Sequence, residues 1–156
     1  MTQASSISSF RTVENVLPTE AGIAEALSKA VGVFGQAGLG GAHLFSIELS
    51  IHEALVNALV HGVRDHGASQ IRLAYEIDDR RVRVVVEDDG ADAITQDGRD
   101  SREEGHGRGL LLIRAFTSRV FSQGRVSSME LDLDEAPVSG SDRIPEILRS
   151  WNSLLW

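Results

Sequence analysis

Two neighbouring segments with alternating apolar and polar residues constrain the fold of this chain most strongly. They cover residues 71–77 and 81–87, and every second residue in each is apolar: Ile71, Leu73, Tyr75, Ile77, Val82, Val84 and Val86. A period of two is typical of a β-strand with one buried face. The three residues between them, Asp78-Asp79-Arg80, are typical of a tight turn. The sequence therefore predicts a hairpin within an antiparallel sheet, one face of which is covered.

Three helical segments are predicted to provide that cover. The central one, residues 47–63, carries an apolar stripe at about 100° per residue, formed by Ile47, Ile51, Leu55, Ala58 and Leu59. An earlier helix is predicted to begin at Pro18-Thr19-Glu20 and to end in the glycines of residues 35–41, and a third to cover residues 110–117. Further strands are predicted at residues 10–17, 119–122 and 127–133. Helices on one face of an antiparallel or mixed sheet make an α+β two-layer sandwich.

Composition excludes several classes of protein. The chain has 156 residues, which fits one domain, and its 15 basic and 23 acidic residues give a formal net charge of −8. This charge argues against a partner that is a nucleic acid or an anionic membrane. The sequence contains no cysteine, which excludes a disulfide framework and a thiolate metal site. It has no apolar run long enough for a transmembrane helix and no signal-peptide pattern at MTQASSISSF, so we expect a cytoplasmic protein.

The predicted domain covers residues 10–134. Residues 1–9 are rich in Ser and Thr and are predicted to form a flexible tail. Residues 135–156 are predicted to be a linker and a C-terminal amphipathic helix. Its apolar residues recur every three or four positions: Ile144, Ile147, Leu148, Trp151, Leu154 and Leu155. The sequence leaves two interpretations open, a helix packed on its own domain or an interaction helix for a partner or a second copy.

Polar residues on the other side of the central helix form the first candidate site. Ser46, Ser50, Glu53, Asn57 and His61 are predicted to align opposite the apolar stripe. The amide oxygen of Asn57 is a hard ligand suited to Mg²⁺, and Glu53, one turn earlier, can accept a proton from a hydroxyl group or water. The alternative is a solvated helix face with hydrogen-bonded pairs four residues apart.

Two segments that contain glycine form the second and third candidates. Asp88, at the end of a predicted strand and beside Gly90, can accept a hydrogen bond from an exocyclic amine such as that of adenine. The alternative is an acidic turn. Further on, GHGRGLLL places Gly105, Gly107 and Gly109 at the start of a helix, where backbone N–H groups can bind phosphates. This segment is neither a Walker A loop nor a dinucleotide fingerprint.

In this order, the three motifs resemble those of the GHKL ATPase superfamily, which has the Bergerat, or histidine-kinase-like ATPase, fold. HEALVNALVHG and GRGLLLIRAF resemble most closely the anti-sigma-factor serine/threonine kinases of partner-switching modules. The resemblance implies an ATP- and Mg²⁺-binding protein in which Glu53 is catalytic, Asn57 holds Mg²⁺ and Asp88 reads adenine. The residues implied to surround the rest of the nucleotide are Gly90, Gly105, His106, Gly107, Arg108, Gly109 and Leu110. His61 and His106 are candidates to face the nucleotide, the alternative being histidines that face solvent or are structural.

The resemblance also implies a homodimer that phosphorylates a STAS-type anti-anti-sigma protein on serine and holds a sigma factor or another regulator. One departure is Asp92, which stands where the family's Asp-x-Gly-x-Gly motif has its second glycine. The charged residues 93–104 would be the lid over the nucleotide. Two alternatives stay open: a binding module with little or no kinase activity, and an ATPase domain that serves a histidine phosphotransfer protein.

Overall fold

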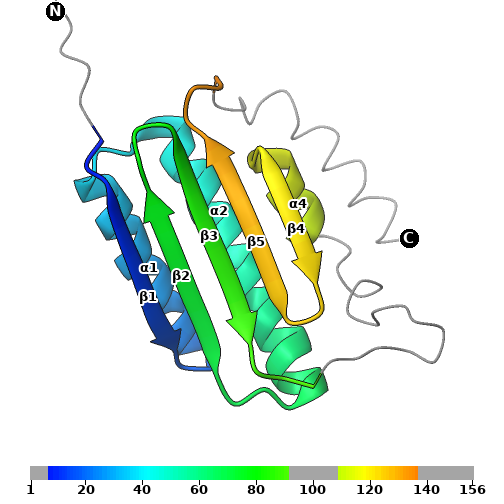
Figure 1. Ribbon diagram of the computed structural model, residues 1–156. Coiled ribbons are helices and arrows are strands. Elements are labelled where there is room, and N and C mark those ends of the chain that lie inside the picture. Colours follow the sequence, from blue (N-terminus) through cyan, green and yellow to red (C-terminus); the bar gives the residue numbers. More distant parts are fainter. Residues whose placement is uncertain (1–6, 92–108, 137–156) are drawn as a thin grey trace, which may run out of the picture.

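The computed structural model describes residues 7–91 and 109–136. These residues form a five-stranded sheet with helices on one face, which confirms the predicted α+β two-layer sandwich (Figure 1). The strands are β1 (Phe10–Val16), β2 (Ile71–Ile77), β3 (Arg81–Asp88), β4 (Arg119–Gln123) and β5 (Val126–Asp132). Their order across the sheet is β1-β2-β3-β5-β4, and every neighbouring pair is antiparallel. Of the two predicted kinds of sheet, the antiparallel one is therefore correct.

β2 and β3 form the predicted hairpin, with the predicted turn at residues 78–80. Ile71 pairs with Asp88 and Ile77 pairs with Val82, so the apolar residues of both strands share the covered face. In the turn, the Asp78 carboxylate accepts hydrogen bonds from the backbone N–H groups of Arg80 (2.8 Å) and Arg81 (3.0 Å). These bonds lower the pKa of Asp78 because they stabilise its ionised form.

The first helix, α1 (Glu20–Gln36), begins where the sequence predicted. Thr19 is its N-cap, and the Thr19 hydroxyl accepts a hydrogen bond of 3.0 Å from the N–H of Gly22. The second helix, α2 (Gly41–Asn57), begins six residues before the predicted Ile47. Glycines at positive φ (Gly38 at 106°, Gly41 at 59°) make the connection tight, so the predicted helix-ending glycines also start the next helix.

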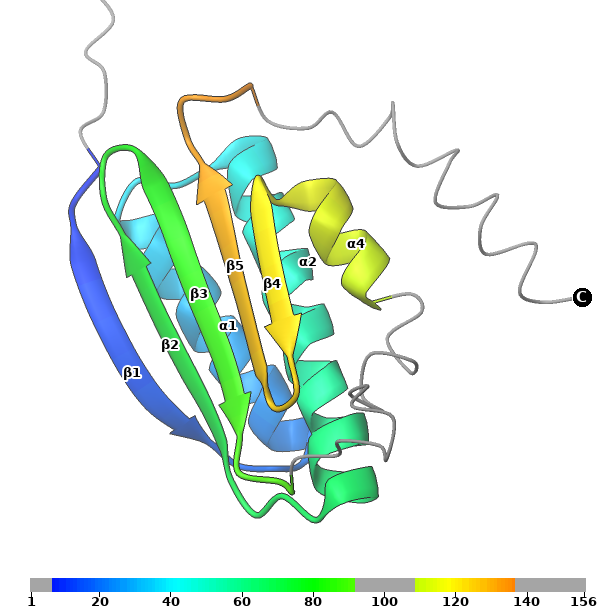
Figure 2. The same ribbon diagram turned by 45° about the vertical axis from the view of Figure 1, so that its right-hand side comes forward.

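All the described helices lie on the same side of the sheet, and α2 lies between α1 and α4 (Gly109–Phe116) (Figure 2). Because α2 has a neighbouring helix on each side, Ser46 and Ser50 are buried. The alternative interpretation of this side of the helix, a solvated face, therefore does not hold for these two serines. The Ser50 hydroxyl is satisfied within the helix, where it donates a 2.7 Å hydrogen bond to the carbonyl of Ser46.

The α2 helix continues as a π-helix, η1 (Ala58–Asp65), which widens its last turns. Such segments are rare and are often found at functional sites. The end of η1 is closed by the N–H of Gly67, which donates to the carbonyl of Val63 (3.2 Å), and by that of Ala68, which donates to Gly62 (2.9 Å). The predicted helix end at Val63 is two residues early.

The core fills the space between the sheet and the helices. One cluster of aromatic rings joins α1 to β1 and β2: Phe34 lies 5.2 Å from Tyr75 and 5.7 Å from Phe10, measured between ring centroids. Within residues 7–91 and 109–136, no helix has the length and apolar character needed to cross a lipid bilayer. The predicted C-terminal helix lies outside the described residues.

Candidate functional site

Glu53 and Asn57 meet the first residue of α4. They stand one turn apart on α2, and both side chains are half-buried. A Cβ atom added to Gly109 would lie 2.9 Å from Asn57 Nδ2, 3.1 Å from Asn57 Oδ1 and 3.1 Å from Glu53 Oε2. A larger residue at this position would push the ends of both polar side chains away from the start of α4. The structure thus brings together residues of the first and third sequence motifs.

Asp88 lies at the end of β3 and is only 5% exposed. Its Oδ1 atom accepts a hydrogen bond of 2.9 Å from the N–H of Gly90, as a turn of the Asp-x-Gly type allows. On its other side the carboxylate lies against η1: a Cβ atom added to Gly62 would be 2.5 Å from both Cγ and Oδ2 of Asp88. Gly62 therefore provides the space in which the carboxylate sits.

One small cavity connects these two sets of residues. It lies between α2, η1, β3 and the β4–β5 hairpin, and it is lined by Ala54, Asn57, Ala58, His61, Val86, Asp88, Gly124, Arg125 and Ser127. An amide at one wall and a buried carboxylate at another offer donor and acceptor groups. The cavity itself has a volume of only about 10 Å³, which is room for about one water molecule. Three of the predicted site residues, Asn57, His61 and Asp88, thus line the same cavity.

His61 lies on η1, one turn after Asn57. Its Nδ1 atom is 3.1 Å from Oδ2 of Asp65, four residues later. This contact orients the ring while the residue lines the cavity. Both interpretations of this histidine, as a ligand contact and as a structural residue, are compatible with that position.

The second of the two consecutive aspartates has a different environment from the first. Asp89 Oδ1 accepts hydrogen bonds from the N–H groups of Ser69 (2.7 Å) and Gln70 (2.9 Å), and Oδ2 accepts one from the Ser69 hydroxyl (2.7 Å). The Ser69 hydroxyl, followed by these N–H groups, lowers the pKa of Asp89. Asp89 therefore ties the loop before β2 to the end of β3, while Asp88 faces the cavity.

Sequence reasoning missed the contribution of the β4–β5 hairpin. Arg125 and Ser127 line the cavity, and the carbonyl of Arg125 accepts a 3.0 Å hydrogen bond from the N–H of Asp88. The turn signal was present, since Gly124 adopts a φ of 56°. Nothing in the sequence of the hairpin indicates that β5 pairs with β3, however, and this pairing is what brings the turn next to Asp88.

Several predicted site residues lie outside the described residues: Asp92, Gly105, His106, Gly107 and Arg108. Their roles, and that of the predicted lid at residues 93–104, stay predictions. Of the glycine-rich segment, the structure places Gly109 against Asn57 and Glu53, and Leu110 in the first turn of α4.

Comparison with known proteins identifies the family. A sequence search among curated proteins finds no match. The family model described as a histidine kinase-like ATPase domain matches residues 16–133. This match runs from the end of β1 to the end of the sheet and includes Glu53, Asn57, Asp88 and Gly109. It indicates an ATP-binding domain, and the chain therefore belongs to the histidine kinase-like ATPase domain family, within the GHKL-type ATPases.

Proposed function

We propose that this protein is an ATP-dependent serine/threonine protein kinase of the anti-sigma-factor type. Its substrate in this proposal is a serine of a STAS-type antagonist, and it also holds a sigma factor or another regulator, acting as a homodimer. The observation that carries the proposal is the convergence of Glu53, Asn57 and Gly109 beside the cavity that Asp88 lines. In this proposal Glu53 would be the base, Asn57 the ligand for a hard cation and Asp88 the carboxylate that binds adenine.

The nucleotide would bind with its adenine at Asp88 and its phosphates near the start of α4. The Asp88 carboxylate would accept a hydrogen bond from the adenine amine. The first N–H groups of α4, which the glycine at position 109 leaves accessible, would face the phosphates.

The residues present fit a magnesium ion that accompanies the phosphates. Asn57 would hold Mg²⁺ through its amide oxygen, and the cation would neutralise charge on the phosphate oxygens. Within the described part of the chain, no three His, Cys, Asp or Glu residues lie close enough together to hold a metal ion. A nucleotide-bound Mg²⁺ needs no such cluster, because phosphates and water supply most of its ligands.

Glu53 would act on the substrate serine. The Glu53 side chain is 20% exposed, so a hydroxyl group from a partner protein can reach it. The carboxylate would accept the hydroxyl proton while the serine oxygen bonds to the γ-phosphorus and the bond to the β-phosphate oxygen breaks, which releases ADP. His52, whose Nδ1 lies 3.4 Å from Glu53 Oε1, would help to hold the carboxylate in place.

The second candidate function is a binding module that holds a sigma factor with little or no kinase turnover. The aspartate at position 92 favours it. A glycine there would adopt left-handed backbone conformations freely, whereas aspartate does so at a cost of about 1 kcal/mol, and its charge would repel phosphates.

Incubation with ATP labelled at the γ-phosphate and a panel of STAS proteins distinguishes the two. Transfer of label to a serine of one STAS protein is the expected result. The matched control is Glu53→Gln, which should still bind ATP but transfer label about 10²–10⁴-fold more slowly. Stable binding of a STAS protein or sigma factor without any transfer of label would establish the binding module instead. Transfer at the same rate by Glu53→Gln would remove Glu53 from the mechanism.

A further inference from the structure

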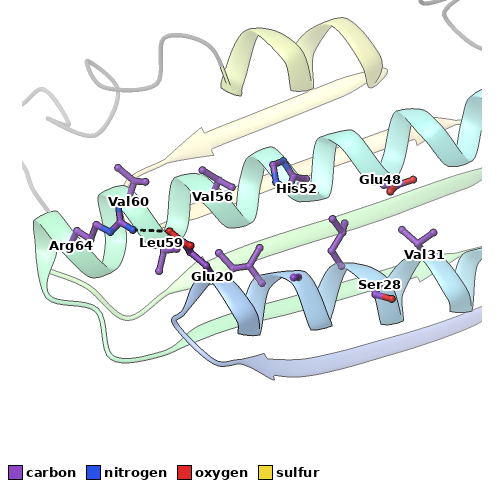
Figure 3. A pocket seen from close by; sticks show the side chains of 12 residues that line it. Glu20, Ser28, Val31, Glu48, His52, Val56, Leu59, Val60 and Arg64 are labelled. Carbon is purple, nitrogen blue, oxygen red and sulfur yellow. Dashed lines mark ion pairs between the residues drawn. The ribbon is translucent and has the colours of Figure 1, made fainter.

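A groove distinct from the cavity beside Asp88 lies on the helical layer, and one of its lining residues, His52, also contacts Glu53. It has a volume of about 640 Å³ and runs between α1 and the continuous helix formed by α2 and η1 (Figure 3). It is lined by Glu20, Ile23, Ala24, Leu27, Ser28, Val31, Glu48, His52, Val56, Leu59, Val60 and Arg64. Seven of these twelve residues are aliphatic, so water fills this groove poorly and a segment of apolar side chains fits it well.

The polar residues of this groove lie mainly at its ends. At one end, Glu20 of α1 and Arg64 of η1 form an ion pair of 3.6 Å. At the other end lie Glu48 of α2 and Ser28 and Val31 of α1 (Figure 3). Glu48 thus lies at the end of the groove nearest the start of α2. The aliphatic side chains lie between Glu48 and the ion pair.

We propose that the C-terminal segment of the same chain, Ile144–Leu155, occupies this groove. The described chain leaves the domain near the start of α2, where the carbonyl of Glu135 lies 3.2 Å from Nε2 of His43. Glu48 follows His43 by little more than one helical turn. Residues 137–143 could span up to about 23–25 Å when extended, enough to pass around a helix about 10–12 Å in diameter. The segment can therefore reach the end of the groove that Glu48 marks.

The segment also matches the groove in length and chemistry. Its apolar residues at helical spacing would cover about 18 Å as a helix. Glu48 and Arg64 are sixteen residues apart along α2 and η1, or about 24 Å, so the groove is long enough. Arg143, immediately before the segment, would arrive next to Glu48, a charge pair that favours this direction of entry. The apolar stripe would then cover side chains such as Leu27, Val56 and Val60.

Cross-linking between introduced cysteines tests this proposal, since the chain has none of its own. We expect Ser28→Cys combined with Ile147→Cys to form a cross-link within one chain when treated with a short thiol-reactive reagent. The matched control is Ser128→Cys combined with Ile147→Cys. Ser128 lies between Val85 and Phe121 on the sheet face that no described helix covers. The yield of the cross-link between positions 128 and 147 should therefore be no higher than background.

Each other outcome of the cross-linking contradicts the proposal. A cross-link between two chains would show that the segment fills the groove of a second copy. A yield for Ser28 no higher than that for Ser128 would show that the segment is not in the groove at all. Circular dichroism of each variant shows whether it is folded before its yield is compared.

Tryptophan fluorescence provides an independent test that needs no cross-link. Both tryptophans of the chain, Trp151 and Trp156, lie in or next to this segment. With the segment in the groove, Val56→Glu should shift the emission to longer wavelength and increase its quenching by acrylamide. Val13→Glu, at a residue that is 55% exposed on the uncovered face of β1, is the matched control and should change neither. Unchanged emission in a folded Val56→Glu protein would overturn the proposal.

Discussion

Position 62 has no room for a side chain, because the carboxylate of Asp88 occupies the space where a Cβ atom would lie. We therefore expect Gly62→Ala to lower the free energy of unfolding by about 1–3 kcal/mol, the usual cost of overpacking. The displaced carboxylate should also weaken ATP binding. Denaturant unfolding and calorimetric titration with ATP measure the two effects.

The matched control is Gly32→Ala in the middle of α1, where no atom lies within 4 Å of the added Cβ. Because alanine restricts the unfolded chain more than glycine, this variant should be about 0.4–1 kcal/mol more stable than the wild type. Equal stability and equal ATP affinity for Gly62→Ala and Gly32→Ala would contradict the contact between η1 and Asp88.

Asp88→Asn should separate nucleotide binding from folding. The new amide oxygen can still accept the hydrogen bond from the N–H of Gly90, so the melting temperature should change little. Because its NH₂ group would face the adenine amine, the hydrogen bond to adenine would be lost. The binding free energy of ATP should then weaken by about 1.5–3 kcal/mol, or about 10–100-fold in affinity. Asp89→Asn is the control and should keep wild-type affinity, since Asp89 bonds to Ser69 and Gln70 instead. Calorimetry that gives one affinity for all three proteins would remove Asp88 from the adenine site.

The sequence singled out Asp88 as the candidate carboxylate, but it did not predict which residues surround Asp88. The Asp-x-Gly pattern was sufficient to single out Asp88, because the strand before it ends there. The space at Gly62 and the turn at Arg125 depend on contacts between segments far apart in the chain. No local pattern encodes such contacts.

Among the elements, the strands were predicted within about two residues, since alternation is a strong local signal. The helix ends were predicted less well. Glycines can end one helix and start the next, and here Gly40 and Gly41 do the latter. The π-helical turns of η1 were not predicted at all, because helical periodicity over so short a segment does not distinguish i→i+5 from i→i+4 bonding.

The loop between η1 and β2 should respond to pH through Asp89. The Ser69 hydroxyl and the N–H groups beside it lower the pKa of Asp89 below its ordinary 3.8. A lowered pKa means that the carboxylate stabilises the fold above its ordinary pKa, and that this contribution is lost as the pH falls through the lower, folded value. Acidification to below about pH 4 should therefore reduce the stability of the wild type more than that of Asp89→Asn.

The matching measurement is an NMR titration of the Asp89 side-chain carbon. In the wild type it should titrate below 3.8, and in Ser69→Ala its pKa should rise toward that value, because the largest cause of the shift is removed. An Asp89 pKa that is the same in both proteins would show that the Ser69 hydroxyl does not bind this carboxylate in solution.

Across the whole molecule, the sheet has one face covered by helices and one face that no described element covers (Figure 2). On this open face, Glu130 of β5 binds three arginines: Arg83 at 3.3 Å, Arg81 at 3.4 Å, and Arg119. The Glu130 side chain is only 15% exposed, so its charge is poorly screened by solvent.

Glu130→Gln should therefore remove the shared partner of all three arginines, leaving Arg83 paired with Glu76, and lower the free energy of unfolding by about 1.5–3 kcal/mol. The loss should be smaller in high salt, which screens the repulsion between the arginines. The control is Glu87→Gln, whose 31% exposed side chain pairs with Arg72, and a smaller loss is expected there. Denaturant unfolding at low and high salt measures both variants, and equal losses independent of salt would argue against a network centred on Glu130.

The family and the two-layer architecture could be predicted from the sequence because three motifs occur in a fixed order along recognisable elements. The assembly of the site could not, because it depends on strand order. Inserting β5 between β3 and β4 places Arg125 and Ser127 beside Asp88, and packing α4 on α2 places Gly109 beside Asn57. Both contacts join segments that are far apart in the chain, so the periodicity of the sequence does not predict them.

The strand order also has a consequence for the chain as it is synthesised. β3 lies in the middle of the sheet, but its partner β5 is the last of the described strands to leave the ribosome. Until then, the nascent β2–β3 hairpin presents an unpaired, valine-rich edge, the kind of template on which chains aggregate. Charged side chains two and four positions apart interrupt that edge: Arg81, Arg83 and Glu87. The side chains that later form ion pairs on the open face should therefore also hinder aggregation of nascent chains.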